Sequence, residues 1–321
     1  MRRFLNYHRD LIVLIAVTFG VGAIMLLLNP GRFLTQNNLR SMAFQFPEIG
    51  ILTLAMMVAM LHGGINLAVV GTANLTAIIT VLVVHAVIPA LGNDWVGAAF
   101  GLGAGFAASL LVGLLSGVLV GYIGVSSILT TLGTMTLVNG ACIVITGGST
   151  ISRLPAPILA IGNGVLFGIP VPLLVFLLCA AGQSLILSRT VFGFSLYMLG
   201  TNSEATRYAG INNPKTLLGV YFLSSFLASI GGVIMMARFN SAKADYGQSY
   251  LLVTILAAVL GGTSASGGYG KVVGVVFAIV MLQMLASGLN LLGVDPFFAI
   301  AMWGAILLVV MTLNHFLRRR A

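Results

Sequence analysis

Charged side chains that could act within a membrane are almost absent from the long apolar stretches of this sequence. The one acid there is Glu48, which follows Pro47. A carboxylate at such a depth is costly unless it faces the interior of a helix bundle. Glu48 is therefore expected to be either a structural glutamate satisfied by a partner or a polar contact on a solute path.

Hydroxyl and amide side chains are more frequent than charges in the same stretches. Many of them will bond to their own helix or to a neighbouring one. A neutral polyhydroxylated solute could nevertheless be carried along groups of this kind, whereas a proton-coupled carrier would need a relay of ionisable groups. The candidate path residues are Glu48, Asn66, Asn74, Thr130, Thr131 and Asn139.

One charged segment, Gly200–Ile211, separates two blocks of apolar stretches and reads GTNSEATRYAGI. From Glu204 to Gly210 it would form about two helical turns. Asn202 or Ser203 can cap the start of this helix, and Gly210 can end it. Such a helix could rock as a lever against a docked protein, and the alternative is a plain connecting loop.

The composition identifies a polytopic membrane protein. Of 321 residues, 59% are hydrophobic and 7% are charged, against about 25% charged in soluble domains. The apolar runs have helical length, which favours an all-α bundle over a barrel. The net charge of +9 comes from basic residues near span ends, without a basic patch interleaved with aromatics, so no nucleic-acid partner is expected. Cys142 and Cys179 lie in apolar runs and are expected to be buried, not paired or metal-bound.

About ten membrane-spanning helices are expected, and the third and eighth are candidates for broken helices because one is interrupted by polar residues and the other is short. The expected spans are 11–29, 43–61, 67–91, 95–122, 126–146, 170–187, 216–237, 250–262, 271–291 and 297–316. The first is expected to be an uncleaved span because its apolar run is too long for a signal peptide.

The distribution of basic residues predicts that both termini are cytoplasmic, because basic residues accumulate on that side. The cytoplasmic segments would then hold Arg2, Arg3, Arg9, Arg189, Arg207, Lys215, Lys271, Arg318, Arg319 and Arg320. The other side would hold Arg32, Arg40, Arg153, Arg238 and Lys243. In this orientation 148–168 is the main outer loop and about 189–215 is the main cytoplasmic loop of a single domain, 1–321.

Two glycine-rich segments stand out among the 40 glycines, His62–Ala77 and Gly261–Gly274. Glycines usually allow close helix packing, but here they stand beside Asn, Ser or Thr at span ends, where a helix can unwind. The string GGYGK at Gly267–Lys271 is not a phosphate-binding loop, because Ala265 and Val272 replace the required glycine and hydroxyl residue. The chain is therefore expected to hold no cofactor, with ATP and magnesium on a partner ATPase.

Four segments resemble, in the same order, motifs of the ribose and simple-sugar permeases of ATP-binding-cassette (ABC) importers, a class that includes branched-chain amino acid permeases. They are GGINLAV (63–69), ILTTLGTMTLVNGACIVITGG (128–148), GTNSEATRYAGI (200–211) and AAVLGGTSASGGYGKVVGVVFA (257–278). The third is similar to the coupling segment that permeases present to their ATPase. The resemblance implies that Asn202, Glu204, Ala205, Arg207 and Gly210 couple the chain to that ATPase.

The resemblance also implies a type II importer permease fold in the bacterial inner membrane. The implied partners are cytoplasmic ABC ATPase subunits, a periplasmic or lipid-anchored binding protein, a second copy or a paralogue, and membrane lipid. The solute would be a small sugar, either a pentose, a hexose or a related polyol. A nucleoside or furanose signal in the same role, a secondary transporter driven through Glu48, and a scaffold without transport are the alternatives.

Overall fold

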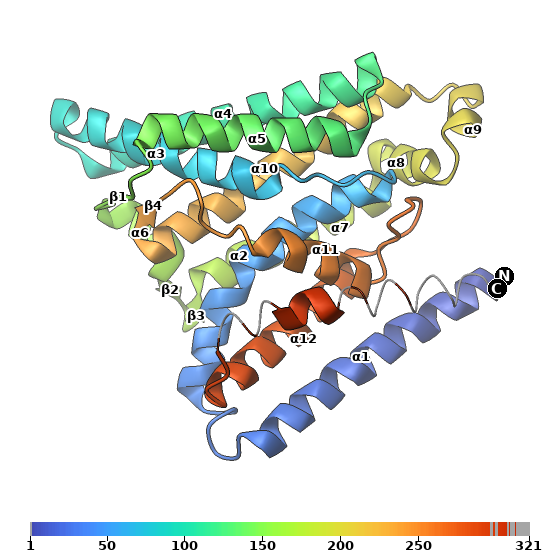
Figure 1. Ribbon diagram of the computed structural model, residues 1–321, viewed down its shortest axis with the longest axis horizontal. Coiled ribbons are helices and arrows are strands. Elements are labelled where there is room, and N and C mark those ends of the chain that lie inside the picture. The colour runs from blue at the N-terminus through green and yellow to red at the C-terminus, as the bar shows by residue number, and fades with distance from the viewer. Residues whose placement is uncertain (1, 296–297, 299–300, 307, 309–311, 313–321) are drawn as a thin grey trace.

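The chain folds into a bundle of helices in a computed structural model that describes residues 2–295, 298, 301–306, 308 and 312 (Figure 1). The helices are α1 (Arg2–Leu28), α2 (Gln36–Leu61), α3 (Val69–Leu91), α4 (Asp94–Val118), the π-helix η1 (Leu119–Ile123), α5 (Ser127–Thr146), α6 (Ala156–Asn163), α7 (Val171–Arg189), α8 (Val191–Thr201), α9 (Ser203–Tyr208), α10 (Asn213–Phe239), α11 (Tyr250–Leu260) and α12 (Val272–Leu291). Strand β1 (Ile151–Ser152) pairs antiparallel with β4 (Ser241–Ala242), and β2 (Val165–Leu166) pairs with β3 (Ile169–Pro170).

Within the described residues, seven helices are long and apolar enough to cross a membrane: α2, α3, α4 with η1, α5, α7, α10 and α12. This confirms a polytopic helical membrane protein. Helix α1 covers the expected first span, and α11 has only 11 residues. The expected tenth span, 297–316, lies largely outside the described residues, so the number ten stays a prediction.

The third expected span contains no break, because α3 runs without interruption from Val69 to Leu91. The non-helical segment 62–68 instead connects α2 to α3. Helix α11 is short, as expected for the eighth span, and the non-helical segment 261–271 connects it to α12. Segment 189–215, expected as a loop with one short helix, contains both α8 and α9, and segment 148–168, expected as the outer loop, contains α6.

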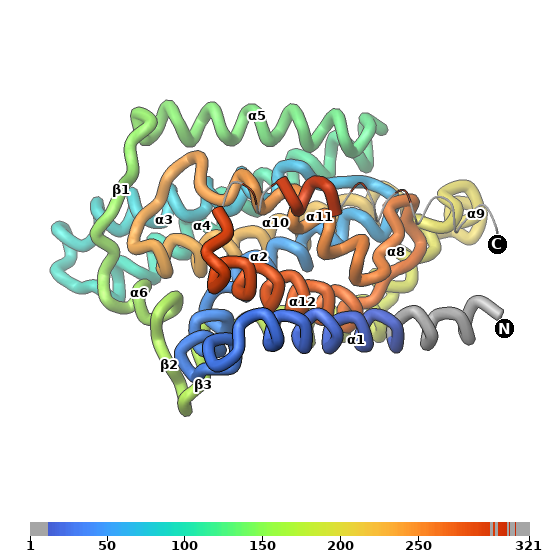
Figure 2. The backbone as a smooth tube through the Cα atoms, turned by 60° about the horizontal axis from the view of Figure 1, so that its bottom comes forward, coloured from blue at the N-terminus to red at the C-terminus, as the bar shows by residue number. Residues whose placement is uncertain are grey.

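Helices α2 and α10 form the centre of the bundle. The side chains from Ile51 to Leu61 of α2 are completely buried. Helix α10 packs against α2, α3 and α4, and at Gly232 an added Cβ would overlap the backbone of Ala73 in α3. Small residues bring helix backbones together where lipid supplies no hydrophobic drive between helices. At the periphery α5 packs mainly on α3, and α1 packs on α12 (Figure 2).

The bundle has two distinct ends (Figure 1). One, here called the α9 end, holds α9 and the beginning of α1. The opposite, or strand, end holds the four short strands and α6. Helix α10 starts beside α9, because Asn213 Nδ2 donates to the Ser203 carbonyl at 2.9 Å, and its 27 residues reach about 40 Å toward the strand end.

Candidate functional site

Helix α9 is a short helix that presents its charged side chains to the outside. The Asn202 side-chain oxygen accepts the backbone N–H groups of Glu204 and Ala205, both at 3.0 Å, so the predicted N-cap is confirmed. Glu204, Ala205 and Arg207 are exposed, whereas Thr206 is buried. Gly210 follows the helix with φ +78°, a conformation that glycine adopts without strain. The segment is thus a preformed, exposed surface, and its coupling role stays a prediction.

Helix α8 connects this surface to the protein interior through closely packed glycines. A Cβ at Gly200, in the last turn of α8, would overlap both the Leu61 carbonyl oxygen and the Gly268 nitrogen. The Gly268 N–H donates to that same Leu61 carbonyl at 2.8 Å. Gly267 lies against the backbone of Gly63 and Gly200. We call this contact of Leu61 with Gly63, Gly200, Gly267 and Gly268 the glycine junction.

The glycine junction joins three segments that are far apart in the sequence. They are the end of α2, the end of α8 and the non-helical segment 261–271. The Tyr197 hydroxyl of α8 adds a hydrogen bond to the Gly270 carbonyl at 2.7 Å. Sequence reasoning singled out each of these segments, but their contact follows only from the fold. A displacement of α8 must therefore move the end of α2 or the segment 261–271.

His62 lies next to the junction, immediately after α2, with its Nε2 3.4 Å from the Tyr221 hydroxyl. Burial lowers the pKa of its imidazole to about 4, from an ordinary value of 6.5. As the pH falls below about 6.5 the unfolded chain binds this proton first, so stability is lost progressively down to about pH 4, by about 3 kcal/mol in total.

We therefore expect the thermal midpoint of the purified chain to fall more steeply between pH 6.5 and 4 in the wild type than in the His62→Gln variant. Differential scanning fluorimetry in detergent at fixed ionic strength measures both curves. Parallel curves would contradict a half-buried, neutral His62.

Two of the expected path residues hold the non-helical segment 62–68 in place. The Asn66 side chain accepts the Ala68 N–H at 3.1 Å and donates to the Ser224 hydroxyl at 2.9 Å. That hydroxyl in turn donates to the Ala55 carbonyl of α2 at 2.8 Å. The Thr131 hydroxyl lies 2.9 Å from the Ile65 carbonyl. These contacts tie the connection between α2 and α3 to α2, α5 and α10.

The other amide and hydroxyl candidates lie elsewhere. Asn74 donates to the backbone carbonyls of Ala244 and Tyr246, both at 2.9 Å, so its amide holds the loop after β4. Thr130 is buried, and its hydroxyl has no hydrogen-bond partner among the described residues. Asn139 faces Gly71 of α3. The six path candidates therefore do not form one site, and their roles on a solute path stay predictions.

Glu48 forms an ion pair with Arg238. Its Oε2 lies 2.6 Å from Nη1 of Arg238, in the last turn of α10, and its Oε1 accepts the Tyr250 hydroxyl at 2.9 Å. Both side chains of the ion pair are largely buried. Arg238 and Tyr250 were missed as site residues, although a basic residue at a span end was a possible partner for the one acid expected within the membrane.

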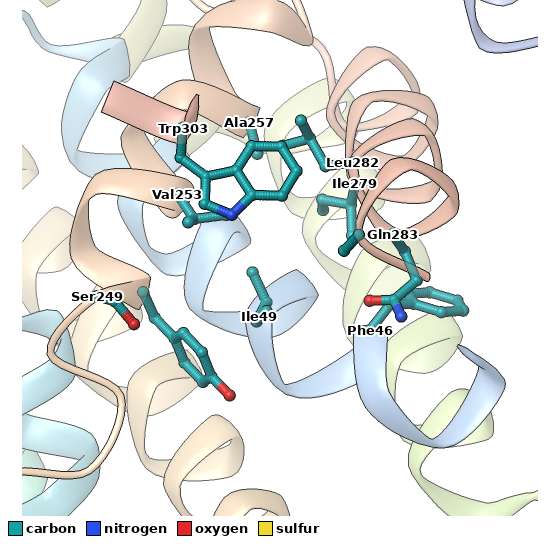
Figure 3. Close-up of a pocket in the computed structure, with 11 residues that line it drawn as sticks. Phe46, Ile49, Ser249, Val253, Ala257, Ile279, Leu282, Gln283 and Trp303 are labelled. Carbon is teal, nitrogen blue, oxygen red and sulfur yellow. The ribbon is translucent and has the colours of Figure 1, made fainter. Parts of the chain in front are cut away.

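A cavity of about 380 Å³ lies beside this ion pair. We call it the polar chamber, and its polar lining includes Asn38, Gln45, Glu48, Arg238, Tyr250 and Gln283. A second cavity of about 230 Å³ shares Ile49, Tyr250, Gln283 and Trp303 with it and is otherwise mainly apolar (Figure 3). Together the two cavities can accept a small molecule with one polar and one apolar side.

The chain matches the family described as the permease component of branched-chain amino acid transport systems over residues 38–313. It is 33% identical over 288 residues to the autoinducer 2 import system permease protein LsrD of Photorhabdus luminescens, covering 87% of this chain and 83% of that protein. It is 31% identical over 310 residues to LsrD of Yersinia pestis strain Pestoides F, covering 94% and 87%. Among solved structures none matches the chain.

Proposed function

The chain belongs to the family of permease components of branched-chain amino acid transport systems, and from this membership we propose that it is the membrane-spanning subunit of an ABC importer for a small sugar or a related furanose. The observation that carries the proposal is the exposed, capped helix α9, which follows directly after α8 and its closely packed glycine junction. A partner that moves α9 would thereby act on the end of α2 and on segment 261–271.

The solute is proposed from the relatives together with the polar groups of the interior. The relatives' printed names specify import of autoinducer 2, so this furanose signal is the first candidate, beside pentoses and hexoses. Neutral hydroxyl and amide groups inside the bundle suit a polyhydroxylated solute better than an ion, because a buried ion would need opposite charges around it.

The proposed assembly contains two permeases, either two copies or this chain with a paralogue, in a bacterial inner membrane. Cytoplasmic ATPase subunits dock on α9, carry the ATP and magnesium, and change their contact with it on binding ATP. A binding protein delivers the solute at the strand end. The start of α1 at the α9 end (Figure 1) supports a cytoplasmic N-terminus in this assembly. With an even number of spans, the C-terminus would be cytoplasmic too.

Transport in proteoliposomes tests the proposal. The chain is reconstituted with its ATPase and permease partners, with binding protein and a panel of D-ribose, D-xylose, D-galactose and autoinducer 2 inside the lumen and ATP outside. ATP-dependent, ionophore-insensitive loss of one solute from the lumen is expected. Movement that needs no ATP but collapses with a proton gradient would replace the proposal with a secondary carrier acting through Glu48.

Reversing the charges of α9 is expected to uncouple ATP hydrolysis by the partner subunits from solute transport. Glu204→Lys and Arg207→Glu should each reduce ATP-dependent transport roughly tenfold or more, because like charges at a docking surface cost several kcal/mol. Arg207→Lys is the matched control, since it keeps the charge at the same exposed position, and it should retain transport. Equal effects of all three variants would argue against docking on α9.

A further inference from the structure

Polar side chains from four helices meet in the polar chamber without any sequence motif that explains them. Helix α2 supplies Gln45 and Glu48, α10 supplies Arg238, α11 supplies Tyr250, and α12 supplies Gln283. Burying such groups is costly unless they are paired. Some are paired with each other, as Gln283 Nε2 is with Gln45 Oε1 at 3.3 Å, but an apolar lining would have packed the bundle without that cost.

The charges of the chamber favour a neutral ligand. Glu48 and Arg238 lie 2.6 Å apart, so their charges compensate and no net charge is left to hold an ion. The guanidinium still has more N–H donors than one carboxylate can accept, and the Gln283 amide has a second N–H and an oxygen beyond its bond to Gln45. Closely spaced donors and acceptors of this kind match the hydroxyl groups of a polyol.

The second cavity is lined mainly by apolar and aromatic side chains. Among them, Ile49, Val253, Leu282 and Trp303 surround one space (Figure 3). A sugar ring has a polar hydroxyl edge and C–H faces that pack on an indole. The polar chamber alone, at about 380 Å³, is within the range of about 300–1,000 Å³ that is usual for small-molecule sites.

The chamber is also on the side where the solute arrives. Arg238 is 25 residues beyond Asn213 in the same helix, because 238 minus 213 is 25, so it lies about 38 Å from the α9 end. We propose that the polar chamber, together with the second, mainly apolar cavity, is a binding site for one neutral sugar of five or six carbons in its ring form. This inference rests on the proposed function and adds a recognition step inside the permease.

Protection of a cysteine in the chamber tests this site. In a background with Cys142→Ala and Cys179→Ala, Ser287→Cys replaces a hydroxyl that lines the chamber and contacts Asn38, and Ala286→Cys serves if that variant does not assemble. The assembled transporter, without binding protein, is labelled with a thiol reagent in the presence of each solute of the transport panel. Ser149→Cys, exposed at the strand end, is the control.

The transported solute is expected to slow labelling in the chamber at least threefold and saturably, without an effect at position 149. Gln283→Leu should remove this protection, whereas Gln183→Leu, which also removes a buried amide but lies outside the chamber, should retain it. A solute that is transported with ATP but gives no protection overturns the inference and leaves the proposed function intact. Absence of ATP-dependent transport overturns the proposed function instead.

Discussion

Gly200→Ala is expected to reduce ATP-dependent transport at least tenfold and to lower the thermal midpoint of the chain. The added methyl group would overlap the Leu61 carbonyl oxygen and the Gly268 nitrogen, both of which belong to the backbone. Backbone atoms cannot move aside as the end of a flexible side chain can, so the helices must separate. Overpacking of this kind costs about 1–3 kcal/mol or more.

Gly103→Ala is the matched control for this substitution. Both glycines lie in helices and have no positive φ, but a Cβ at Gly103 would meet no atom within 4 Å. Since alanine favours helix over glycine by about 0.5–1 kcal/mol, Gly103→Ala should retain transport and keep or raise the midpoint. The two variants thus separate steric contact from helix propensity. Wild-type transport by Gly200→Ala would refute the role of the glycine junction.

Loss of transport in Gly200→Ala can reflect poor assembly or failed coupling, and ATP hydrolysis distinguishes these. If the variant still binds its ATPase partners and hydrolyses ATP at the wild-type rate, the defect lies between α8 and the segments that it contacts at the junction. The close backbone contacts there leave little space for α8 to slide past the end of α2.

The sequence predicted the membrane class, the non-helical backbone within the two glycine-rich segments and the cap at Asn202, because each depends on local composition. It did not predict α8. This helix has only 11 residues, too few for a span, and it lies in segment 189–215, which was interpreted as a loop because of its charged residues. Helices buried in a bundle and helices facing lipid are both apolar, so periodicity does not show which face packs where. A partner for Glu48 was expected because an unpaired carboxylate is costly in the membrane, but the identity of that partner depends on the tertiary fold.

The contacts at Glu48 and at the glycine junction are examples of this limit. Glu48 and Arg238 are 190 residues apart in the sequence, because 238 minus 48 is 190, and a single sequence carries no signal that pairs them. Leu61, Gly200 and Gly268 likewise come from three separate segments. The residue types predicted that Glu48 needs a counter-charge and that the glycines allow close backbone contact. Which residues fill these roles depends on the tertiary structure.

Helices α2 and α11 both connect the chamber to the junction. Glu48 and Leu61 lie on α2, 13 residues apart because 61 minus 48 is 13, which is about 20 Å along the helix. Helix α11 begins with Tyr250 at the chamber and leads to Gly268 at the junction. We propose that a shift of the junction reaches the chamber through these two helices, which would give the importer a physical route from α9 to its solute.

Arg238→Met is expected to cause the largest loss of stability. It leaves the Glu48 carboxylate buried without its counter-charge, and breaking a buried ion pair in this way costs about 3–5 kcal/mol. The double variant Glu48→Gln/Arg238→Met should recover much of that loss, because no isolated charge remains. Thermal unfolding of the two single variants and the double variant in detergent gives the coupling energy of the pair.

Lys243→Met provides the comparison, because it breaks the more exposed Lys243–Asp245 pair and should change stability by only about 0–1 kcal/mol. The double variant also separates stability from recognition. It should fold and assemble, yet lose the protection of a chamber cysteine by solute, because both charged partners for hydroxyl groups are gone. If it instead keeps both fold and protection, Glu48 and Arg238 serve the fold alone and recognition rests on the amides and Tyr250.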